Sequence, residues 1–370
     1  MGENSADALI VGAGPAGIAA AIAASLKGLK VAVADPRKPP IDKPCGEGLL
    51  PEAVSALRRL GIHLTSALAF PLSGIRFVTA EGSASALLPP GAAFGLRRKA
   101  LHQLLVDRAT DLGVSFLWGA RVPELLRGGA SVDGSRFRCQ WIVGADGQNS
   151  TVRKWAGLES ARTQRSRFGF RRHFSVAPWT DHVEVHWGER CQLFVTPTAH
   201  DEVCVAILSH DARLRVDSAL ALFPSVGKKL RGARPTSPEL GAVTALAKAR
   251  AVVQGNVSLI GDASFSVDGI AGQGMSLAFQ QAVPLSDALV GGNLRHYAAA
   301  HRRITKMPQR ITRLLLEMGG RAWLRRKALR LFTRTPSVFS QAVSIHTGEI
   351  APEELRVREI FGFGWQVLRA

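Results

Sequence analysis

Residues 7–35 read D-A-L-I-V-G-A-G-P-A-G-I-A-A-A-I-A-A-S-L-K-G-L-K-V-A-V-A-D, and this stretch decides the fold. The apolar run at 7–11 is typical of a buried parallel strand, the Ala-rich run at 15–27 of a helix, and the run at 30–34 of a second strand. Gly28 is suited to end the helix in a left-handed conformation. Together, the two strands and the helix between them predict a β-α-β unit with a right-handed crossover.

The turn between the first strand and the helix carries Gly12, Gly14, Pro15, Ala16 and Gly17. In this pattern the glycines form a tight turn, let the backbone approach a pyrophosphate, and pack the helix closely on the strand. The helix start directs unpaired N–H groups at the phosphates. Asp35, at the end of the second strand, is placed to accept hydrogen bonds from a ribose hydroxyl. The stretch therefore predicts a dinucleotide site.

The same stretch has a second interpretation, because residues 8–26 contain no charge and are long enough for a membrane span. Its glycines and Pro15 argue against that, and the acidic segment before it does not resemble a signal peptide. We therefore expect a strand, a turn and a helix.

Composition narrows the class of protein. The 370 residues are too many for one minimal domain, and 46% hydrophobic with 21% charged residues is typical of a globular protein. A net charge of +18 favours an anionic partner: nucleic acid, a membrane surface or a phosphate-bearing cofactor. With one Tyr and 6% aromatic residues there is little material for stacking bases, so we expect no nucleic-acid partner.

The four cysteines show neither a C-x-x-C pair nor metal-like spacing with histidines. We expect no metal site and no disulfide framework, and we expect a reduced, cytoplasmic protein.

Periodicity assigns further elements along the chain. We expect helices at 51–60, 98–112 and 274 to about 289, parallel-type strands at 140–145 and 257–260, and antiparallel strands at 183–187, 192–196 and 203–208.

Two later motifs follow predicted strands: G144-A-D146-G147 and G261-D262-A263, the latter leading into D268-G-I-A-G272-Q-G274. A fourth motif is R98-x-x-L-x-x-x-L-x-x-x-A-x-x-x-G113. With the N-terminal turn, these motifs resemble the FAD-binding oxidoreductases of the p-hydroxybenzoate hydroxylase type and their geranylgeranyl-reductase-like relatives. The resemblance covers roughly residues 7–290.

The resemblance implies an α/β fold: a Rossmann-like FAD-binding domain of the glutathione-reductase type, an inserted, mostly antiparallel substrate domain, and a C-terminal helical region. We expect the discontinuous FAD-binding domain at 1–70, 95–165 and 250–290. The substrate domain is expected at 71–94 and 166–249, and the basic helical region at 291–370.

The resemblance also implies cofactor contacts. It places Asp35 at the adenosine ribose, Val122 at the adenine through its backbone, Arg98 on the cofactor, Asp146 with Gly147 near the pyrophosphate, Gly261 and Asp262 at the ribityl and phosphate groups, and Gly272 and Gly274 at the flavin ring.

The segment K43-P-C45-G46-E47-G48 resembles the geranylgeranyl-reductase-like branch, which places its Cys-Gly pair beside the flavin. Cys45 has two interpretations, a working thiol or a small apolar residue in a tight turn. The Y-x-W-x-F-P signature of archaeal lipid reductases and the W-x-W-x-I-P signature of halogenases are both absent. Phe265 and Gly269 stand where hydroxylases carry His and Pro.

The substrate side is less defined. In the strand at 183–187, Val183, Val185 and Trp187 share one face, while Glu184 and His186 share the other, and either face suits a pocket. Our candidate pocket residues are His173, His186, Phe194 and Phe265. The two histidines are interpreted either as acid–base or orienting groups or as structural residues.

The segment 294–334 holds twelve Lys or Arg and one acid, Glu317, interleaved with large apolar residues. It is interpreted either as a basic amphipathic surface that lies on the inner face of a membrane, or as helices packed on the catalytic lobe.

These observations favour an FAD-dependent monooxygenase that uses NAD(P)H and O₂ on a small apolar aromatic, polyketide-like or quinone-like substrate. The alternative is a geranylgeranyl-reductase-like ene-reductase of a lipophilic isoprenoid. Rivals of other classes are a nucleic-acid-binding protein, suggested by charge alone, and a flavin-bearing interaction protein without turnover.

Overall fold

The computed structural model describes residues 4–80, 82–160 and 166–350, and its first sheet has eight strands. Five are parallel in the order β20-β11-β1-β2-β8; β19 pairs antiparallel with β20, and the β9–β10 hairpin joins β11. The strands are β1 Ser5–Val11, β2 Val31–Asp35, β8 Ser115–Trp118, β9 Glu124–Leu126, β10 Gly129–Val132, β11 Ser135–Gly144, β19 Val253–Gln254 and β20 Val257–Leu259.

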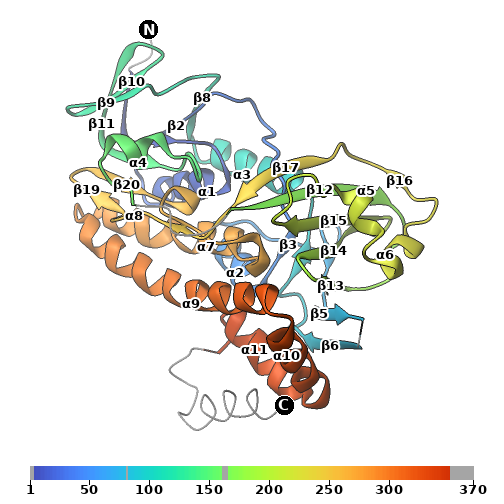
Figure 1. The fold of residues 1–370 in the computed structure, drawn as a ribbon. Helices are drawn as coiled ribbons and strands as arrows, with labels where there is room; N and C mark the ends of the chain where they lie inside the picture. The colour runs from blue at the N-terminus through green and yellow to red at the C-terminus, as the bar shows by residue number, and fades with distance from the viewer. Residues whose placement is uncertain (1–3, 81, 161–165, 351–370) are drawn as a thin grey trace.

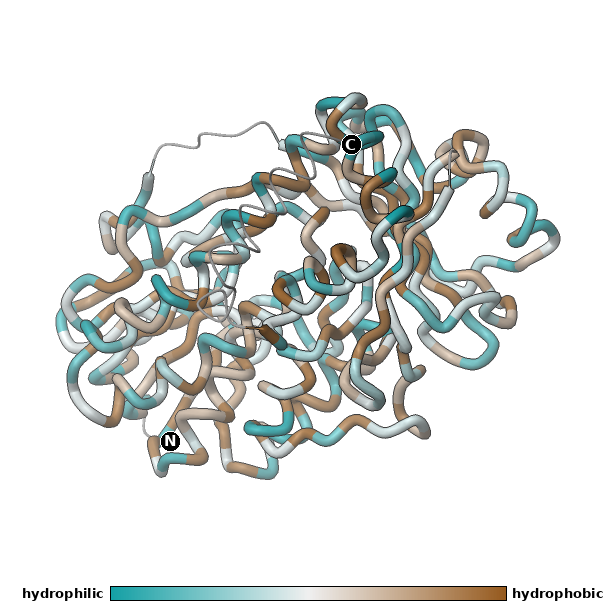
Figure 2. The backbone as a smooth tube through the Cα atoms, turned by 90° about the horizontal axis from the view of Figure 1, so that it is seen from below, coloured by the Kyte–Doolittle hydropathy of each residue, from teal (hydrophilic) through white to brown (hydrophobic). Residues whose placement is uncertain are grey.

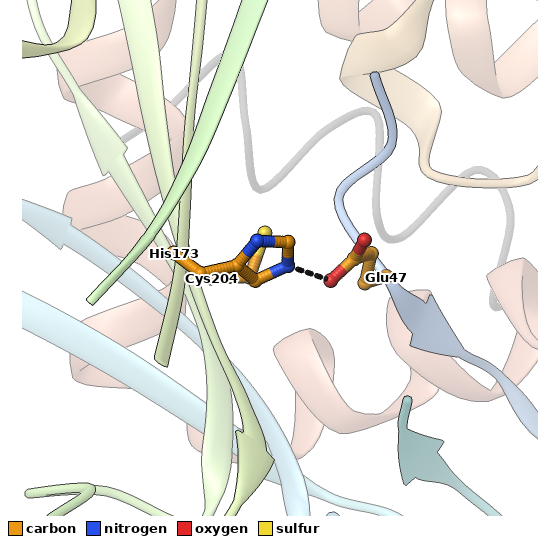
Figure 3. A group of neighbouring side chains, drawn as sticks. All are labelled: Glu47, His173 and Cys204. Atoms are coloured by element: carbon orange, nitrogen blue, oxygen red, sulfur yellow. Dashed lines mark hydrogen bonds and ion pairs between the residues drawn. The ribbon is translucent and has the colours of Figure 1, made fainter. Parts of the chain in front are cut away.

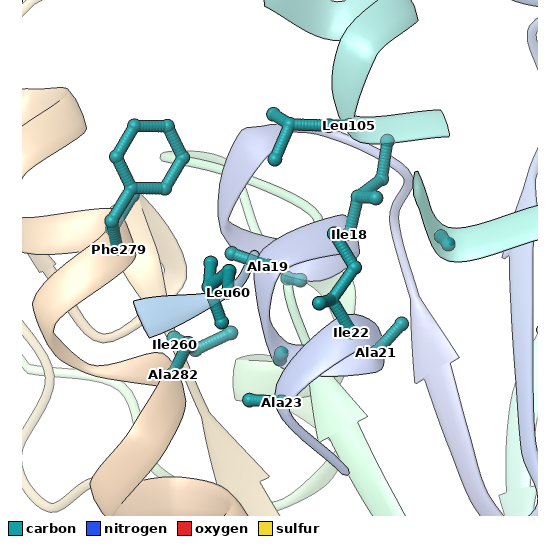
Figure 4. Close-up of a cluster of buried hydrophobic side chains, with 14 of the residues drawn as sticks. Ile18, Ala19, Ala21, Ile22, Ala23, Leu60, Leu105, Ile260, Phe279 and Ala282 are labelled. Atoms are coloured by element: carbon teal, nitrogen blue, oxygen red, sulfur yellow. The ribbon is translucent and has the colours of Figure 1, made fainter. Parts of the chain in front are cut away.

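Both faces of this sheet are buried, which explains the unbroken apolar runs of its strands. In β1, Ile10 packs with the helices on one face and Leu9 belongs to the cluster on the other. The helices on the first face are α1 Pro15–Ser25, α2 Pro51–Arg59, α3 Arg98–Asp111, α7 Gly274–Gln280 and α8 Ala282–Val290. Figure 4 shows Ile18 and Ile22 of α1 in one cluster with Leu105 and Phe279.

The second sheet has the strand order β16-β12-β15-β14-β13-β5-β6, with β17 paired to β12. All its pairs are antiparallel except β5 with β13. The strands are β5 Gly74–Thr79, β6 Gly82–Leu87, β12 Arg167–Ser175, β13 His182–Trp187, β14 Cys191–Ala199, β15 Glu202–Ser209, β16 Arg234–Pro235 and β17 Leu240–Thr244. They come from two separate parts of the chain, so the sheet is an insertion between elements of the first.

Short elements connect or flank the two sheets. They are β3 Gly48–Leu49, β4 Phe70–Pro71, β7 Phe94–Gly95, β18 Ala247–Lys248, β21 Phe265–Ser266, α4 Thr151–Trp155, α5 Val216–Leu220, α6 Pro224–Lys229 and the 3₁₀ turns η1 Gly261–Ala263 and η2 Gly269–Ala271.

Three helices close the described chain: α9 Leu294–Gly320, α10 Ala322–Arg334 and α11 Pro336–His346. In Figure 1 the long orange α9 runs from α8 towards β5 and β6, where α10 and α11 pack. Figure 2 shows that hydrophilic segments lie mostly at the periphery and hydrophobic ones through the interior. Among the described residues, no helix is both long enough and apolar enough to cross a membrane.

The mixed α/β fold, the β-α-β unit, the antiparallel insertion and the helical C-terminal region agree with the sequence-based predictions. One helix is corrected: the run from Gly274 to about Leu289 is divided at Gln281 into α7 and α8. Pro284 has no N–H to donate to the carbonyl of Gln280, so the helical ladder is interrupted there. Residues 351–370 of the predicted helical region lie outside the described residues.

Candidate functional site

A cavity of 1120 Å³ is bounded by the carboxyl ends of the first sheet, one face of the second sheet and the C-terminal helices. Twelve of the sixteen predicted cofactor residues line it: Gly14, Pro15, Ala16, Cys45, Gly46, Arg98, Asp146, Gly147, Gly261, Asp262, Gly272 and Gly274. These residues come from six separate places in the chain. Their gathering follows from the parallel sheet, because its strands end at the same edge and their loops meet there.

Four predicted cofactor residues do not line the cavity, and two of these are glycines with packing roles. A Cβ on Gly17 would lie 1.9 Å from the Gly12 carbonyl oxygen, and one on Gly12 would lie 2.4 Å from that of Ala145. Gly12 also has φ +109°, a left-handed value that favours glycine. These glycines thus shape the turn rather than its surface.

Asp35 and Val122 also lie outside the cavity wall. The Asp35 carboxylate accepts from the Ala13 N–H at 2.9 Å and from the Arg37 side chain at 3.0 Å. Val122 packs against the apolar cluster on the second face of the sheet. Burial raises the pKa of Asp35, but the bonds from Arg37 and Ala13 outweigh it, so that the pKa is lowered.

The lining fits an extended dinucleotide. A Cβ added to Gly14, Gly46, Gly272 or Gly274 meets no atom within 4 Å, so at these positions the backbone is open to the cavity. Among the described side chains, Arg98 Nε and Asp146 Oδ1 are buried without a hydrogen-bond partner. The other oxygen of Asp146 accepts from the Thr151 and Val152 N–H groups, which fixes the carboxylate in place. A buried donor and a buried acceptor are thus available to a ligand.

Lys43 and Asp262, which carry opposite charges, both line the cavity and interact electrostatically. Burial lowers the pKa of Lys43, and Arg37 and Arg98 lower it further. Burial raises the pKa of Asp262, while Lys43 and Arg98 oppose that rise. The excess of cationic groups suits an anionic pyrophosphate.

The turn at 268–274 is held by a buried ion pair with the second sheet. Asp268 Oδ1 accepts from the Ile270 N–H at 3.0 Å and from Arg167 at 2.9 Å, and the Arg167 and Asp268 side chains are both buried. Gly272 has φ +63°, and α7 then begins at Gly274, which opens to the cavity. Arg167 of β12 therefore anchors the turn that the resemblance assigns to the flavin.

Cys45 lines the cavity in the loop before β3. Its Sγ accepts from the Glu47 N–H at 3.3 Å, and burial raises the pKa of the thiol. The thiol is therefore protonated at neutral pH, which makes it a poor nucleophile.

Glu47, which we did not predict as a site residue, also lines the cavity and is almost completely buried. Its carboxylate accepts from the Arg98 N–H at 3.1 Å and contacts His173 Nε2 at 2.5 Å, while Arg171 lies 3.5 Å away. Figure 3 shows His173 and Cys204, from neighbouring strands, facing Glu47. Glu47 has φ +60°, a rare conformation that its residue type does not signal.

The ligand atoms of Glu47, His173 and Cys204 all lie within 4.8 Å of one another. The buried Arg171 guanidinium lies 3.5 Å from Glu47, so a divalent ion there would meet its positive charge. We therefore interpret the cluster as an ion-pair network.

The structure decides between the two faces of β13. Val183, Val185 and Phe194 line the cavity, whereas His186 lies on the opposite face, bonded to Glu184 at 3.0 Å. His186, which we predicted as a pocket residue, therefore does not line this cavity.

Two other residues that we predicted for the pocket, Phe265 and His173, do not line this cavity. Phe265 is buried in a separate cluster with Leu246, Val267 and Leu277, away from the cavity. His173 lies behind the wall formed by Glu47 and Arg171. We selected both residues because of their side-chain chemistry. In the folded protein their side chains lie outside the cavity wall.

The cavity continues past the turn at 268–274 into an apolar half, in which Phe194 is a residue that we predicted and the residues of α9–α11 are not. Its wall includes Phe77 and Phe194 of the second sheet together with Met307, Ile311, Leu314, Leu315 and Met318 of α9, Phe332 of α10, and Phe339 and Val343 of α11. His346, at the end of α11, also lines it; burial lowers the pKa of this imidazole to about 4, so it is neutral at pH 7.

Comparisons with known proteins agree with this geometry. The model of a family described as FAD binding domain matches residues 5–228. Menaquinone reductase of Mycobacterium tuberculosis is 29% identical over 307 residues, which cover 75% of each chain. Rifampicin monooxygenase of Rhodococcus hoagii is 29% identical over 158 residues, 40% of this chain and 33% of that protein.

A solved flavoprotein/dehydrogenase from Cytophaga hutchinsonii superposes with a TM-score of 0.81 at 16% identity, covering 93% of both chains. At that identity the likeness concerns the fold.

Proposed function

Because the chain belongs to the FAD binding domain family, we propose that this FAD-dependent oxidoreductase reduces a carbon–carbon double bond in a lipid-soluble isoprenoid. The observation that carries the proposal is the continuity of the cavity, which joins the Gly272–Gly274 turn to the apolar walls of α9 and α11. The similarity to a menaquinone reductase over three quarters of both chains supports an isoprenoid quinone as the first substrate to test.

We call the part of the cavity lined by Gly14, Arg98, Asp146 and Asp262 the cofactor half. Its residues are suited to each part of FAD. We propose that Gly14 and the start of α1 bind the pyrophosphate, with Arg98 as a donor and Asp146 as an acceptor. Asp262 would bind the ribityl hydroxyls. Bound FAD, once reduced, would supply a hydride to the substrate, and we propose that NAD(P)H, bound only transiently, would reduce it.

The substrate half would hold the isoprenoid and exclude water. Phe77, Phe194 and Phe339 provide apolar walls, so a reacting double bond would lie in a medium of low polarity. We propose the Cys45 thiol as a group that donates a hydrogen bond to the substrate, since it lines the cavity and is protonated at neutral pH.

A monooxygenase is the second candidate, because the same apolar enclosure would protect an oxygenated cofactor from water. The partial match to a rifampicin monooxygenase supports it. In this case the substrate would be a small apolar aromatic, O₂ would be consumed, and NAD(P)H would again be the reductant.

The two candidates differ in whether they need oxygen. We would incubate the FAD-loaded enzyme with menaquinone, NADH and NADPH, with and without O₂, and weigh the product. A product heavier by two hydrogens under nitrogen supports the reductase. A product heavier by one oxygen, formed only in air, replaces it with the monooxygenase, and unchanged substrate in both arms contradicts both for this quinone.

We further propose that an exposed face of α9 contacts a membrane surface from which a lipid substrate is drawn. Arg302, Lys306 and Arg313 are exposed, and none of them has an ion pair with an acid in the described part of the chain. Leu314 is 47% exposed beside them and also lines the cavity. Basic side chains next to an exposed apolar residue fit an anionic bilayer.

A further inference from the structure

A chain of hydrogen bonds crosses the second sheet from the cavity wall to the surface. Glu47 lines the cavity, and its Oε2 lies 2.5 Å from His173 Nε2. His173 Nδ1 lies 2.8 Å from Ser237 Oγ, and Ser237 is half-buried in the connection between β16 and β17. The His173 side chain is only 2% exposed, and it connects Glu47 at the cavity wall with Ser237 near the surface.

We propose that Ser237, His173 and Glu47 relay protons from solvent to the cavity. The inference rests on the proposed reduction, in which the hydride goes to one carbon of the double bond and a proton to the other. Water gives a proton to Ser237, whose hydroxyl passes its own to His173 Nδ1. The imidazole gives its Nε2 proton to Glu47, which releases it into the cavity.

The hydrogen bonds around His173 set the form of the imidazole from which the relay starts. Arg171 lies 3.2 Å from His173 Nδ1 and 3.5 Å from Glu47, and its own charge is balanced by Asp42 at 2.7 Å. A guanidinium only donates, so His173 Nδ1 accepts from Arg171 and the ring hydrogen lies on Nε2, which faces Glu47. The relay therefore starts with an acceptor at Nδ1, towards Ser237, and a donor at Nε2, towards Glu47.

Other titratable or charged groups also face the pair. Cys204 lies beside both members, and Cys45, Arg97 and Arg98 lie on the Glu47 side. Burial raises the pKa of both thiols, which keeps them neutral at pH 7. The relay is therefore the ionisable path through this wall in the described structure.

The sheet also provides a matched control. His186 and Glu184 form a second buried pair, 3.0 Å apart on β13, and neither lines the cavity. Removing this pair perturbs the same sheet without touching the relay.

The decisive measurement follows proton uptake when bound FAD is reduced, because it needs no substrate. The FAD-loaded wild type, Glu47→Gln, His173→Gln and His186→Gln would be mixed with reduced methyl viologen, a donor of electrons without protons, beside a pH-indicator dye. We expect uptake to lag behind flavin bleaching by at least about tenfold in the first two variants and to match it in wild type and His186→Gln. A larger solvent deuterium isotope effect should accompany the lag.

Turnover with menaquinone gives a second readout: kcat should fall with KM unchanged in the two relay variants. Uptake that keeps pace with bleaching in Glu47→Gln and His173→Gln overturns the relay, as does uptake abolished by a metal chelator in wild type. If the wild type reduces no isoprenoid but proton uptake still lags in Glu47→Gln and His173→Gln, the proposed substrate is wrong and the relay stands.

Discussion

At the scale of single residues, glycines of one short motif serve different purposes. Gly17 and Gly12 have no room for a Cβ because backbone carbonyl oxygens lie against them, while Gly14 faces the open cavity. Gly12 and Gly17 are therefore needed for the turn to form, and Gly14 keeps its surface open to a ligand.

We predict that Gly14→Val folds normally but binds FAD about tenfold more weakly, about 1.4 kcal/mol, since its side chain enters the cavity. Gly17→Ala should instead lower the free energy of unfolding by about 1–3 kcal/mol. Fluorescence titration with FAD and thermal melts of the apoprotein check both. Equal loss of stability in the two variants would contradict this division of roles.

Cys45 should react slowly with iodoacetamide at pH 7, because burial raises its pKa and only the thiolate reacts. The rate should rise as the pH passes the ordinary thiol value of about 8.5. Mass spectrometry of the modified peptide, with Cys45→Ser as the blank, measures it. Rapid alkylation at neutral pH would instead indicate an activated thiol.

At the scale of elements, the site depends on ties between pieces of chain that are distant in sequence. Arg97, which precedes α3, donates to Glu202 of β15 at 2.7 Å, so the helix that begins with Arg98 is fixed to the second sheet. Arg167 does the same for the turn at 268–274. The two sheets are thereby held at a set separation around the cavity.

The tie through Glu202 should make stability depend on pH. Burial alone would raise its pKa, but bonds from Arg97, Thr236 and Thr198 lower it to about 2. The folded value lies below the unfolded one of about 4.3, so the stabilisation is complete above that pH and is lost as the pH falls towards 2.

We therefore expect Glu202→Gln to lower the free energy of unfolding by about 1–3 kcal/mol at pH 7, a value reduced by the partial exposure of Arg97. The difference from wild type should shrink below pH 4. Urea unfolding at several pH values tests this, and a difference that is constant with pH would assign the loss to packing instead.

At the scale of the whole molecule, the C-terminal helices complete the cavity and also present a basic surface. Leu314 of α9 lies at the cavity wall and is exposed, and α10 and α11 pack on β6. The proposed substrate pocket and the proposed membrane contact therefore belong to the same helix.

We predict that the FAD-loaded protein sediments with vesicles containing phosphatidylglycerol but not with pure phosphatidylcholine, and that salt weakens the binding. Arg302→Gln, Lys306→Gln and Arg313→Gln combined should abolish sedimentation while leaving turnover of detergent-dispersed substrate unchanged. Lys154→Gln, Arg231→Gln and Arg234→Gln remove the same charge from other exposed positions and should sediment like wild type. If the triple variant on α9 still sediments like wild type, the membrane contact lies on another surface of the protein.

The sequence by itself determined the β-α-β unit, and twelve of the sixteen residues that it singled out for a cofactor line the cavity. Short-range rules suffice there, because glycine turns and strand ends of a parallel sheet bring their loops to one edge. The insertion and the helical C-terminal region were likewise visible in periodicity, whereas the break between α7 and α8 was missed although Pro284 signals it.

Only the tertiary structure decided the face of β13 that forms the pocket, the burial of Phe265, the network around Glu47 and the apolar half formed with α9–α11. Each depends on side chains from strands and helices that are distant in the sequence, such as Glu47 and His173. Their contacts follow from the register of the second sheet and the packing of the helices on it, and local propensity carries no information about either.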